Sequence, residues 1–552
     1  MVRIVDVSPG HSLFQLISSV WNATTNTNNR AMHRLCTLMR KMGVQSAIVE
    51  TLPFETPELV GEKEALDTYF GESLTAEVFR LSFSRIPVIN PDDILRLPSE
   101  GAILSSSIVF NLRPSGRDWF SYVFSSIVGR PRLQVPGTEA YPLLLNNYIH
   151  SSQTFRCQIA LSPTERAEFN IVGTFFCQQN LFTSRCAHAA LSTALNNTVA
   201  GAHQLVYPHH LNKVLGLASG SSSTGLHPGL NNQDIAALVS YYNLRLESKE
   251  YFSSIDANNG YADHLYRYVE SGFPCLLGFT TAIERHIVPV VGHTLNSDMW
   301  RPEAEPAYKR VGPVSYRPAS QWVDHFIVHD DNFGMYFCLP IDALRRATLP
   351  SHDKPFRAFA GFTITPPEVK NPPQICEWAS LSLLQHFLGA LVPTMYGTHY
   401  WFRELTGAVL QGGVRPMVVR TLLVKKTDYL LHLELKDNEE NVFGPAEIAL
   451  QVDHLPASFW LTEVSIPDLY TANKTKLGDI LFRSDRELPV IMPGTTQQDA
   501  AAQLDQWSSE NWIQVRLPGQ LVKRGDSTAH PMVVGSHYPV FRVHGEERPL
   551  EW

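Results

Sequence analysis

One short run of this sequence brings together residue types that can do chemistry. Residues 178–190 read Gln-Gln-Asn-Leu-Phe-Thr-Ser-Arg-Cys-Ala-His-Ala-Ala, which places three side-chain amides shortly before Cys186. Small and apolar residues recur after Cys186 at helical spacing, so we expect a helix to begin there, with Thr183 or Ser184 as its N-cap. The positive end of a helix favours the thiolate, which is the reactive form of cysteine. The run therefore predicts a cysteine nucleophile.

A reactive thiol needs a base, and the base needs a group that orients it. His286 stands at the start of an expected apolar strand, and Asp330, Asp331 and Asn332 stand at the end of the next one. Because neighbouring strands lie about 4.8 Å apart, a histidine on one strand can touch an acid on the other. Side chains alternate along a strand, so we expect only one of the two aspartates to face the histidine. Asp330 is the first candidate, with Asp331 and Asn332 as alternatives.

Other histidines compete for the role of base or could bind a metal. His293 follows a glycine at a strand end and His325 opens a strand, so either could replace His286. His325, His329 and the neighbouring aspartates are also metal-ligand types, and His188 lies near the cysteine. However, His325 and His329 on one strand would lie about 13 Å apart, too far to share an ion. No HExxH motif occurs. We therefore expect neither a metal nor a cofactor.

The elements expected around these residues follow an α+β order. After the helix at Cys186, apolar residues at helical spacing predict helices near residues 235–242 and 263–271. Strands are expected next, over residues 275–279, 287–291 and 326–330. Helices that precede a sheet, rather than alternating with its strands, indicate an α+β fold and not a doubly wound one.

In this order and spacing, residues of about 170–345 resemble the papain-like cysteine peptidases, and most closely their bacterial branch of leader-peptidase-like domains. The resemblance depends on the amide-rich run before Cys186, Gly229-Leu230 and the helix to Tyr242, Gly272-Phe273-Pro274 leading into the sheet, His286 heading an apolar strand, and the strand ending in Asp330. It implies a nucleophile helix packed on an antiparallel sheet. It also implies that Cys186 is the nucleophile, His286 the general base and Asp330 the group that orients the imidazole.

The resemblance further implies an oxyanion hole formed by the Cys186 backbone N–H and an upstream side-chain amide. The family usually has a glutamine six residues before the cysteine. In this chain Asn180 stands there, and Gln179 and Gln178 lie seven and eight residues before the cysteine. Either Asn180 takes the role, or a one-residue bulge brings Gln179 into place.

Three functions are consistent with these residues. The resemblance implies a cysteine peptidase that cleaves a peptide or isopeptide bond of a protein or peptide substrate through a thioester intermediate. Transglutaminase-like and arylamine acetyltransferase-like enzymes use the same residue types in the same order, so acyl transfer or deamidation is an alternative. The third is an inactive peptidase-like module for binding or scaffolding, which the missing glutamine and the large remainder of the chain favour.

Proline clusters suggest where domains meet. Residues 366–373 contain four prolines and predict a linker, and Pro136-Gly137 and Pro142 mark a weaker boundary. The expected domains are a mixed α/β domain of unknown role (1–150), the papain-like domain (151–365), a linker (366–374) and an α+β domain for recognition or support (375–552). In the last domain we expect a core helix near 378–391 and strands over residues 418–425, 429–435 and 459–466.

Composition restricts the function classes further. The 552 residues carry a formal net charge of −8, which argues against a nucleic-acid-binding surface. Seven cysteines without a Cys-x-x-Cys pair argue against a disulfide framework or a zinc–thiolate site and favour a reducing compartment. The N-terminus lacks a signal-peptide pattern, and no uninterrupted apolar run reaches about 18 residues. We therefore expect a cytoplasmic protein without a membrane span.

Overall fold

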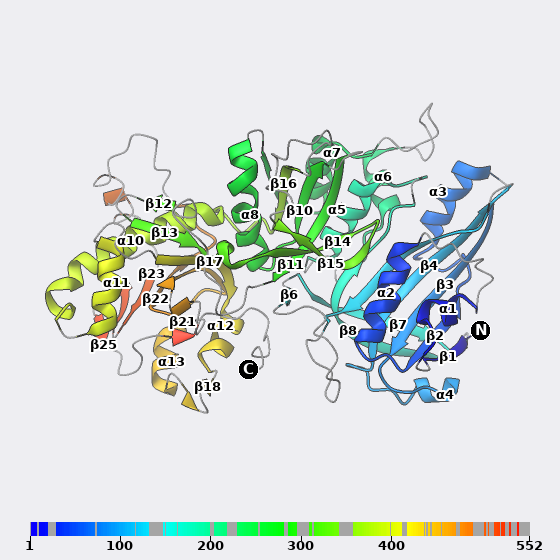
Figure 1. Cartoon of the computed structure of the whole chain (residues 1–552), viewed down its shortest axis with the longest axis horizontal. Coiled ribbons are helices and arrows are strands. Elements are labelled where there is room, and N and C mark those ends of the chain that lie inside the picture. The colour runs from blue at the N-terminus through cyan, green and yellow to red at the C-terminus, as the bar shows by residue number, and fades with distance from the viewer. Residues whose placement is uncertain are drawn as a thin grey trace. The chain divides into compact units, whose positions relative to one another are not determined.

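Antiparallel sheets with helices packed on them form a mixed α+β architecture in the computed structural model of this chain (Figure 1). The structure describes residues 2–7, 10–19, 29–71, 74–115, 118–131, 147–149, 151–162, 164–180, 182–198, 204–217, 229–251, 254–280, 285–294, 309–311, 314–341, 357–397, 399–410, 417–434, 436–437, 440–441, 444–453, 455–467, 469–470, 475–488, 499, 502–503, 506, 513–518, 520–524, 529–531 and 538–539. The serine- and glycine-rich stretch 219–229, expected to be a loop, lies outside them except for Gly229, and so does the weak boundary near residue 137.

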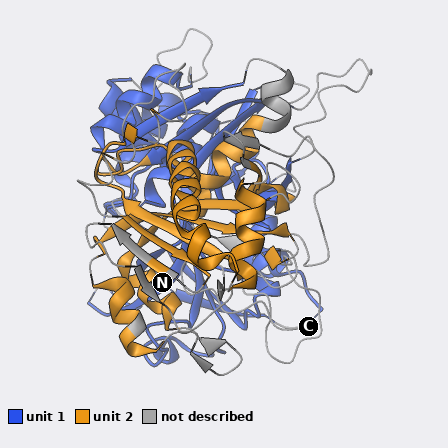
Figure 2. Ribbon diagram, turned by 90° about the vertical axis from the view of Figure 1, so that its left-hand side faces the viewer, with its two compact units in different colours: residues 1–258, 273–294, 325–364 blue, residues 259–272, 295–324, 365–552 orange. Residues whose placement is uncertain are grey.

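The chain forms two compact units, coloured separately in Figure 2. Unit 1 comprises residues 1–258, 273–294 and 325–364, and unit 2 comprises residues 259–272, 295–324 and 365–552. These limits differ from those expected from the proline clusters. Residues on both sides of position 150 belong to unit 1, and the linker expected at 366–374 lies within unit 2. Unit 2 also takes two short segments from the middle of the chain.

The first sheet of unit 1 is built from the N-terminal part of the chain. Its strand order is β1 (Val2–Asp6), β2 (Ser46–Thr51), β3 (Leu74–Ser84), β4 (Ile103–Pro114), β5 (Phe120–Gly129), β8 (Arg166–Phe176) and β7 (Gln153–Ala160). The pairing of β5 with β8 carries the sheet across residue 150. Helix α2 (Arg30–Lys41) buries Leu35, Leu38 and Met39 in the core beside this sheet. The other helices here are α1 (Leu13–Ser18), α3 (Val60–Phe70) and α4 (Pro91–Ile94).

The second sheet of unit 1 carries the residues predicted for chemistry. Its order is β15 (Gly334–Pro340), β14 (His325–Asp330), β11 (Arg285–Thr294), β10 (Cys275–Thr280), β16 (Arg357–Thr365) and β9 (Arg245–Glu250), and β6 (Asn147–Ile149) also pairs with β11. Helices α5 (Cys186–Asn196), α6 (Pro208–Leu215) and α7 (Asn232–Tyr241) accompany it. Ala187, Ala190 and Leu191 of α5 pack in one core with Leu276 and Ile287 of the sheet. The helix and strand expectations for this region are confirmed.

Unit 2 is organised around a third sheet. Its order is β12 (Lys309–Val311), β13 (Val314–Pro318), β17 (Met417–Lys425), β20 (Ser458–Ser465), β22 (Gly478–Arg483), β23 (Ile513–Leu517), β24 (Gln520–Arg524) and β25 (Ala529–Pro531). The helices are α8 (Ser254–Glu270), which begins in unit 1, α10 (Pro373–Met395), α11 (Tyr400–Leu410), α12 (Lys426–Leu433) and α13 (Pro445–Val452), with a 3₁₀ turn at Ala319–Trp322. Two small sheets pair β18 (Lys436–Asp437) with β19 (Glu440–Asn441) and β21 (Thr475–Lys476) with β26 (Tyr538–Pro539).

Four sequence expectations in unit 2 are tested directly, and the strands expected over residues 418–425 and 459–466 are confirmed as β17 and β20. The strand expected over residues 429–435 is wrong, because α12 covers most of this segment and buries Tyr429 and Leu433, which are four residues apart as on one helix face. The helix expected near 378–391 is α10, whose buried residues run from Pro373 to Leu388. Among the described helices, only α10 is long and apolar enough to cross a membrane, and half of its apolar stretch is buried inside the structure.

A row of buried charges crosses the third sheet. Arg420, Glu463, Asp479 and Arg516 occupy facing positions on β17, β20, β22 and β23. Arg420 lies 2.8 Å from Glu463, Arg516 contacts Asp479, and Lys476 lies 2.6 Å from Glu463 and 2.9 Å from Asp479. Buried ion pairs contribute little net stability, but each strongly penalises loss of its partner. We therefore assign these paired charges to the folding of unit 2 and not to a binding or catalytic site.

Candidate active site

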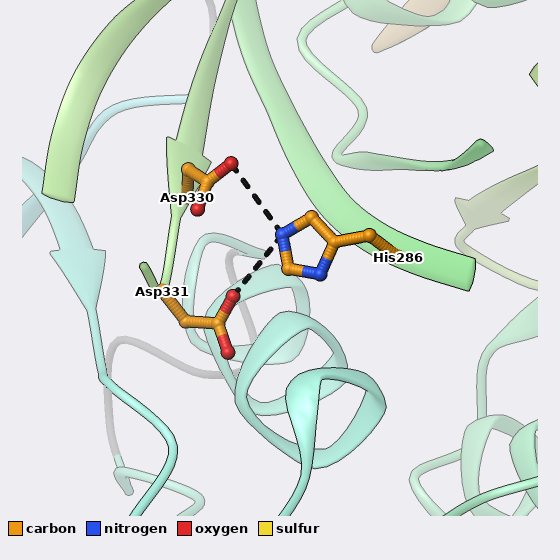
Figure 3. Close-up of side chains that lie close together, drawn as sticks. All are labelled: His286, Asp330 and Asp331. Atoms are coloured by element: carbon orange, nitrogen blue, oxygen red, sulfur yellow. Dashed lines mark ion pairs between the residues drawn. The ribbon is translucent and has the colours of Figure 1, made fainter. Parts of the chain in front are cut away.

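The imidazole of His286 lies against two carboxylates at the end of the neighbouring strand (Figure 3). His286 is the second residue of β11, and Asp330 is the last residue of β14, which pairs with β11. The Nε2 atom of His286 is 3.4 Å from Oδ2 of Asp330 and 3.3 Å from Oδ1 of Asp331. All three side chains are no more than 7% exposed. The structure thus brings the expected base and its expected orienting group together and adds a second carboxylate.

The turn that follows β14 explains how Asp330 is held. Its Oδ1 accepts hydrogen bonds from the backbone N–H of Asn332 at 2.8 Å and of Phe333 at 3.2 Å. With one oxygen held by the backbone, the other faces His286. The expectation that only one aspartate can face the histidine is wrong, because β14 ends at Asp330 and its pairing shifts register just before that residue. Strict alternation no longer applies to Asp331.

The surroundings of His286 favour its protonated form. Burial alone would lower the pKa of an imidazole. The Asp330 carboxylate, the neighbouring Cys186 side chain and the negative charge of Asp331 favour the protonated ring, outweigh burial and raise the pKa of His286 to about 11. At neutral pH His286 is therefore an imidazolium that is ion-paired to two carboxylates.

Cys186 is the first residue of α5, as the sequence predicts. The N-cap differs from expectation, because it is Arg185, and neither Thr183 nor Ser184 takes that position. Instead, Nδ1 of His188 accepts a hydrogen bond from the Arg185 backbone N–H at 3.3 Å. His188 Nε2 lies 2.9 Å from Oδ1 of an asparagine in α6, so His188 supports the start of the helix and is not placed as a metal ligand.

Burial makes the six other cysteines poor nucleophiles. All seven are free thiols, and only Cys186 and Cys338 are half-buried, the other five being buried. Burial raises the pKa of Cys36, Cys157 and Cys177 to about 12. It also raises the pKa of the Cys275, Cys376 and Cys338 thiols.

The three upstream amides have different environments. Gln178 is engaged with β5, since its Oε1 accepts from the Val123 backbone N–H at 3.0 Å. Asn180 is fully buried. Its side-chain amide is already hydrogen-bonded to residues of its own loop and to the carboxylate of Glu62. Gln179 is half-buried, and its Nε2 lies 3.4 Å from Oδ1 of Asn332, two residues after Asp330. Of the three, Gln179 is therefore the amide placed beside the His286–carboxylate group.

The rival histidines lie away from this group. His293 pairs with Phe326 near the opposite end of β11, seven residues and about 23 Å of strand from His286. His325 is at the opposite end of β14 from Asp330, with its backbone N–H donating to Thr294 Oγ1. Both are therefore unsuited to act as the base for Cys186.

His329, a candidate ligand in the metal interpretation, is a buried structural residue. Its Nε2 lies 2.7 Å from Thr174 Oγ1, and its Nδ1 accepts from the Tyr336 backbone N–H at 3.1 Å. Burial lowers the pKa of His329 to about 3, so the ring is neutral.

The candidate ligand set for a cation differs from the one the sequence suggests. Nε2 of His286 and carboxylate oxygens of Asp330 and Asp331 all lie within 4.8 Å of one another, and these groups are of types that bind divalent cations. A metal would need the neutral imidazole, whereas the raised pKa of His286 favours a proton on this ring. Proton and metal therefore compete for the same position, and at neutral pH the proton is favoured.

Sequence reasoning missed Glu62, a buried carboxylate that contacts Asn180. Nothing in its local sequence marks it, because it lies on an otherwise ordinary helix far from Cys186 along the chain.

Comparisons with known proteins do not add to this description. No protein-family model matches the chain, and neither a curated protein nor a solved structure matches it.

Proposed function

We propose that unit 1 is a cysteine-dependent acyl-transfer enzyme of the papain-like type, acting as a peptidase on a peptide or isopeptide bond. The observation that carries the proposal is His286, which interacts with the Cys186 thiol while its Nε2 faces the carboxylates of Asp330 and Asp331. A protonated imidazole beside a cysteine at a helix N-terminus is the arrangement that stores the nucleophile as a thiolate–imidazolium pair.

The reaction follows from these positions. The Cys186 thiolate attacks the substrate carbonyl carbon, and the carbonyl π electrons move onto its oxygen. The backbone N–H of Cys186 and the Gln179 amide stabilise this oxyanion. The C–N bond then breaks, and the imidazolium of His286 gives its proton to the leaving amine, which leaves a thioester. Neutral His286 next takes a proton from water, whose oxygen attacks the thioester and releases the acid and the thiolate.

The two aspartates have separate contributions in this mechanism. Asp330 is held by the turn after β14 and orients the ring, whereas Asp331 adds a second negative charge that favours the imidazolium. Asn332 contacts Gln179 and links the end of β14 to the amide of the oxyanion site. Asn332 is thus a positioning residue in this proposal, and the orienting role stays with Asp330.

A labelling experiment tests the proposal. The full chain is incubated with a peptide-based acyloxymethyl ketone, and the labelled residue is identified by mass spectrometry, with Cys338→Ser as the background because Cys338 is also half-buried. We expect stoichiometric labelling of Cys186, its loss in Cys186→Ala, and a rate at least tenfold lower in His286→Ala. Unchanged labelling in Cys186→Ala refutes the nucleophile assignment. Because metal is not required in this proposal, a chelator should leave the labelling rate unchanged.

The acceptor of the acyl group distinguishes hydrolysis from transfer, since the steps up to the thioester are shared. After the enzyme is acylated with an activated ester, product mass with and without added primary amine shows whether water or amine resolves the thioester. Acid as the dominant product supports the peptidase. Amide as the dominant product supports a transferase that uses the same three residues.

A further inference from the structure

A buried carboxylate from the N-terminal part of unit 1 contacts the loop that precedes Cys186. Glu62 lies near the start of α3 and is 2% exposed. Its Oε1 accepts hydrogen bonds from Nδ2 of Asn180 at 2.6 Å and from the Tyr122 hydroxyl at 2.7 Å. Its Oε2 lies 3.6 Å from Nδ1 of His209. Hydrogen bonds to a carboxylate are shorter and stronger than neutral ones, so Glu62 fixes the Asn180 amide firmly.

Asn180 in turn organises the whole loop. Its Oδ1 accepts from the backbone N–H groups of Phe182 at 2.9 Å, Thr183 at 2.8 Å and Ser184 at 3.2 Å. Its own backbone N–H donates to the Ser184 hydroxyl at 3.2 Å. Since Glu62 holds the nitrogen of this amide, the oxygen can point only toward the loop backbone. One carboxylate therefore fixes Asn180 and, through it, the backbone of residues 182–184.

A second line of contacts connects the same loop to the start of α5. The Thr183 carbonyl accepts from Nδ2 of Asn212 at 2.9 Å, and Oδ1 of Asn212 lies 2.9 Å from Nε2 of His188. His188 Nδ1 accepts from the Arg185 backbone N–H, directly before Cys186. Because His188 Nδ1 acts as an acceptor, Nε2 carries the proton and donates to Asn212. The position of the loop is thus transmitted to the residue that begins the nucleophile helix.

The outer side of the loop is anchored by aromatic rings. Phe182 packs against Tyr69 at 5.4 Å, Phe70 at 4.8 Å and Phe120 at 5.7 Å between ring centroids. Two of these rings lie at the end of α3, the helix that carries Glu62. Helix α3 therefore holds the loop from inside through a carboxylate and from outside through an aromatic contact.

We propose that Glu62 is a positioning residue for the acyl-transfer reaction, which acts through Asn180 to fix the segment between Gln179 and Cys186. This inference rests on the proposed function. The two groups assigned to the oxyanion hole, the Gln179 amide and the Cys186 N–H, lie at the two ends of this segment. Oxyanion donors are effective only within a few tenths of an ångström of the correct position, so a loop that shifts loses them. The N-terminal sheet and helices are then the frame of the active site rather than a separate recognition domain.

Two reactions of the same thiol separate this role from a merely structural one. Alkylation of Cys186 by iodoacetamide forms no oxyanion, whereas acylation by a p-nitrophenyl ester does. In Glu62→Ala we expect the acylation rate to fall about 10- to 100-fold, and the alkylation rate to stay within about twofold. Glu62→Gln should restore most of the acylation rate, because its Oε1 can accept the same two hydrogen bonds.

A matched control is Glu50, which is also a buried carboxylate and lies on strand β2 of unit 1. Its ion-pair partner is Arg80, at 3.3 Å, and not a residue of the 180–184 loop. Glu50→Ala should lower stability and leave the ratio of acylation to alkylation unchanged. If Glu62→Ala does not fold, Tyr122→Phe removes one of the two donors to the Glu62 Oε1 and should lower the ratio about threefold.

The outcomes separate the two proposals. A wild-type chain that is alkylated at Cys186 but is never acylated removes the proposed function, and this inference with it. A wild-type chain that is acylated as fast as Glu62→Ala removes this inference alone. Equal losses of alkylation and acylation in Glu62→Ala also overturn it, because they show a general disturbance of the site.

Discussion

The two carboxylates at His286 yield the most direct quantitative prediction. The ordinary pKa of histidine is 6.5, and that of His286 is raised to about 11. An opposite charge within about 4–6 Å moves a pKa by about 1–3 units, so Asp330→Asn and Asp331→Asn should each lower the pKa of His286 to about 9. In the double variant only burial and the Cys186 contact remain. With about 2 units lost for each carboxylate, the pKa should then fall to about 7, where burial, which favours the neutral ring, is no longer outweighed.

The assay is a pH titration of the full chain carrying ¹³Cε1-labelled histidine, followed by NMR, with His286→Gln used to assign the signal. Since 1.36 kcal/mol corresponds to one pKa unit, each aspartate is expected to stabilise the imidazolium by about 3 kcal/mol. The rate of Cys186 alkylation at pH 7 provides the functional counterpart. It should fall most in the double variant, where His286 no longer carries the full charge that favours the thiolate.

The two single variants separate orientation from charge. Asp330 is held by the backbone of its turn and should affect both the pKa of His286 and the acylation rate. Asp331 should affect mainly the pKa. If His286 titrates near 6.5 in the wild-type chain, or if Asp331→Asn leaves its pKa unchanged, the double-carboxylate reasoning is refuted.

Three further predictions follow from the described contacts. Because the folded pKa of His286 exceeds its unfolded value, its contribution to stability is complete below about pH 6.5 and is lost as pH rises toward 11; chemical denaturation of wild type and His286→Gln across this range measures the difference, and parallel curves contradict it. Asn180→Ala leaves three backbone N–H groups without their acceptor and should destabilise unit 1 by about 2–4 kcal/mol; a thermal shift near zero contradicts it. Glu377→Ala leaves the buried Arg267 guanidinium without its carboxylate and should cost about 3–5 kcal/mol. Calorimetry should show this loss in unit 2 while Cys186 alkylation is unchanged, and a slower alkylation contradicts the assignment.

Local pattern in the sequence determined the elements that carry the candidate site. The helical spacing after Cys186 predicted α5, and the apolar runs predicted β10, β11 and β14 to within three residues at each end. These predictions succeed because each element buries one face, and burial imposes its period on the chain. A short apolar run does not define a period. The run over residues 429–435 predicts a strand, whereas most of it lies in α12, where Tyr429 and Leu433 are buried four residues apart.

Tertiary structure alone decided which side chains meet. Asp331 faces His286 because the strand ends and turns there, which alternation along an ideal strand does not reveal. Gln179, rather than Asn180, lies beside Asn332 because Asn180 is occupied by the loop and by Glu62. The limits of the two units depend on strand pairing between segments far apart in sequence. A sequence determines local periodicity, but contacts between distant segments depend on how the strands pair and the helices pack. The role of a residue such as Glu62 can therefore be recognised only in the tertiary structure.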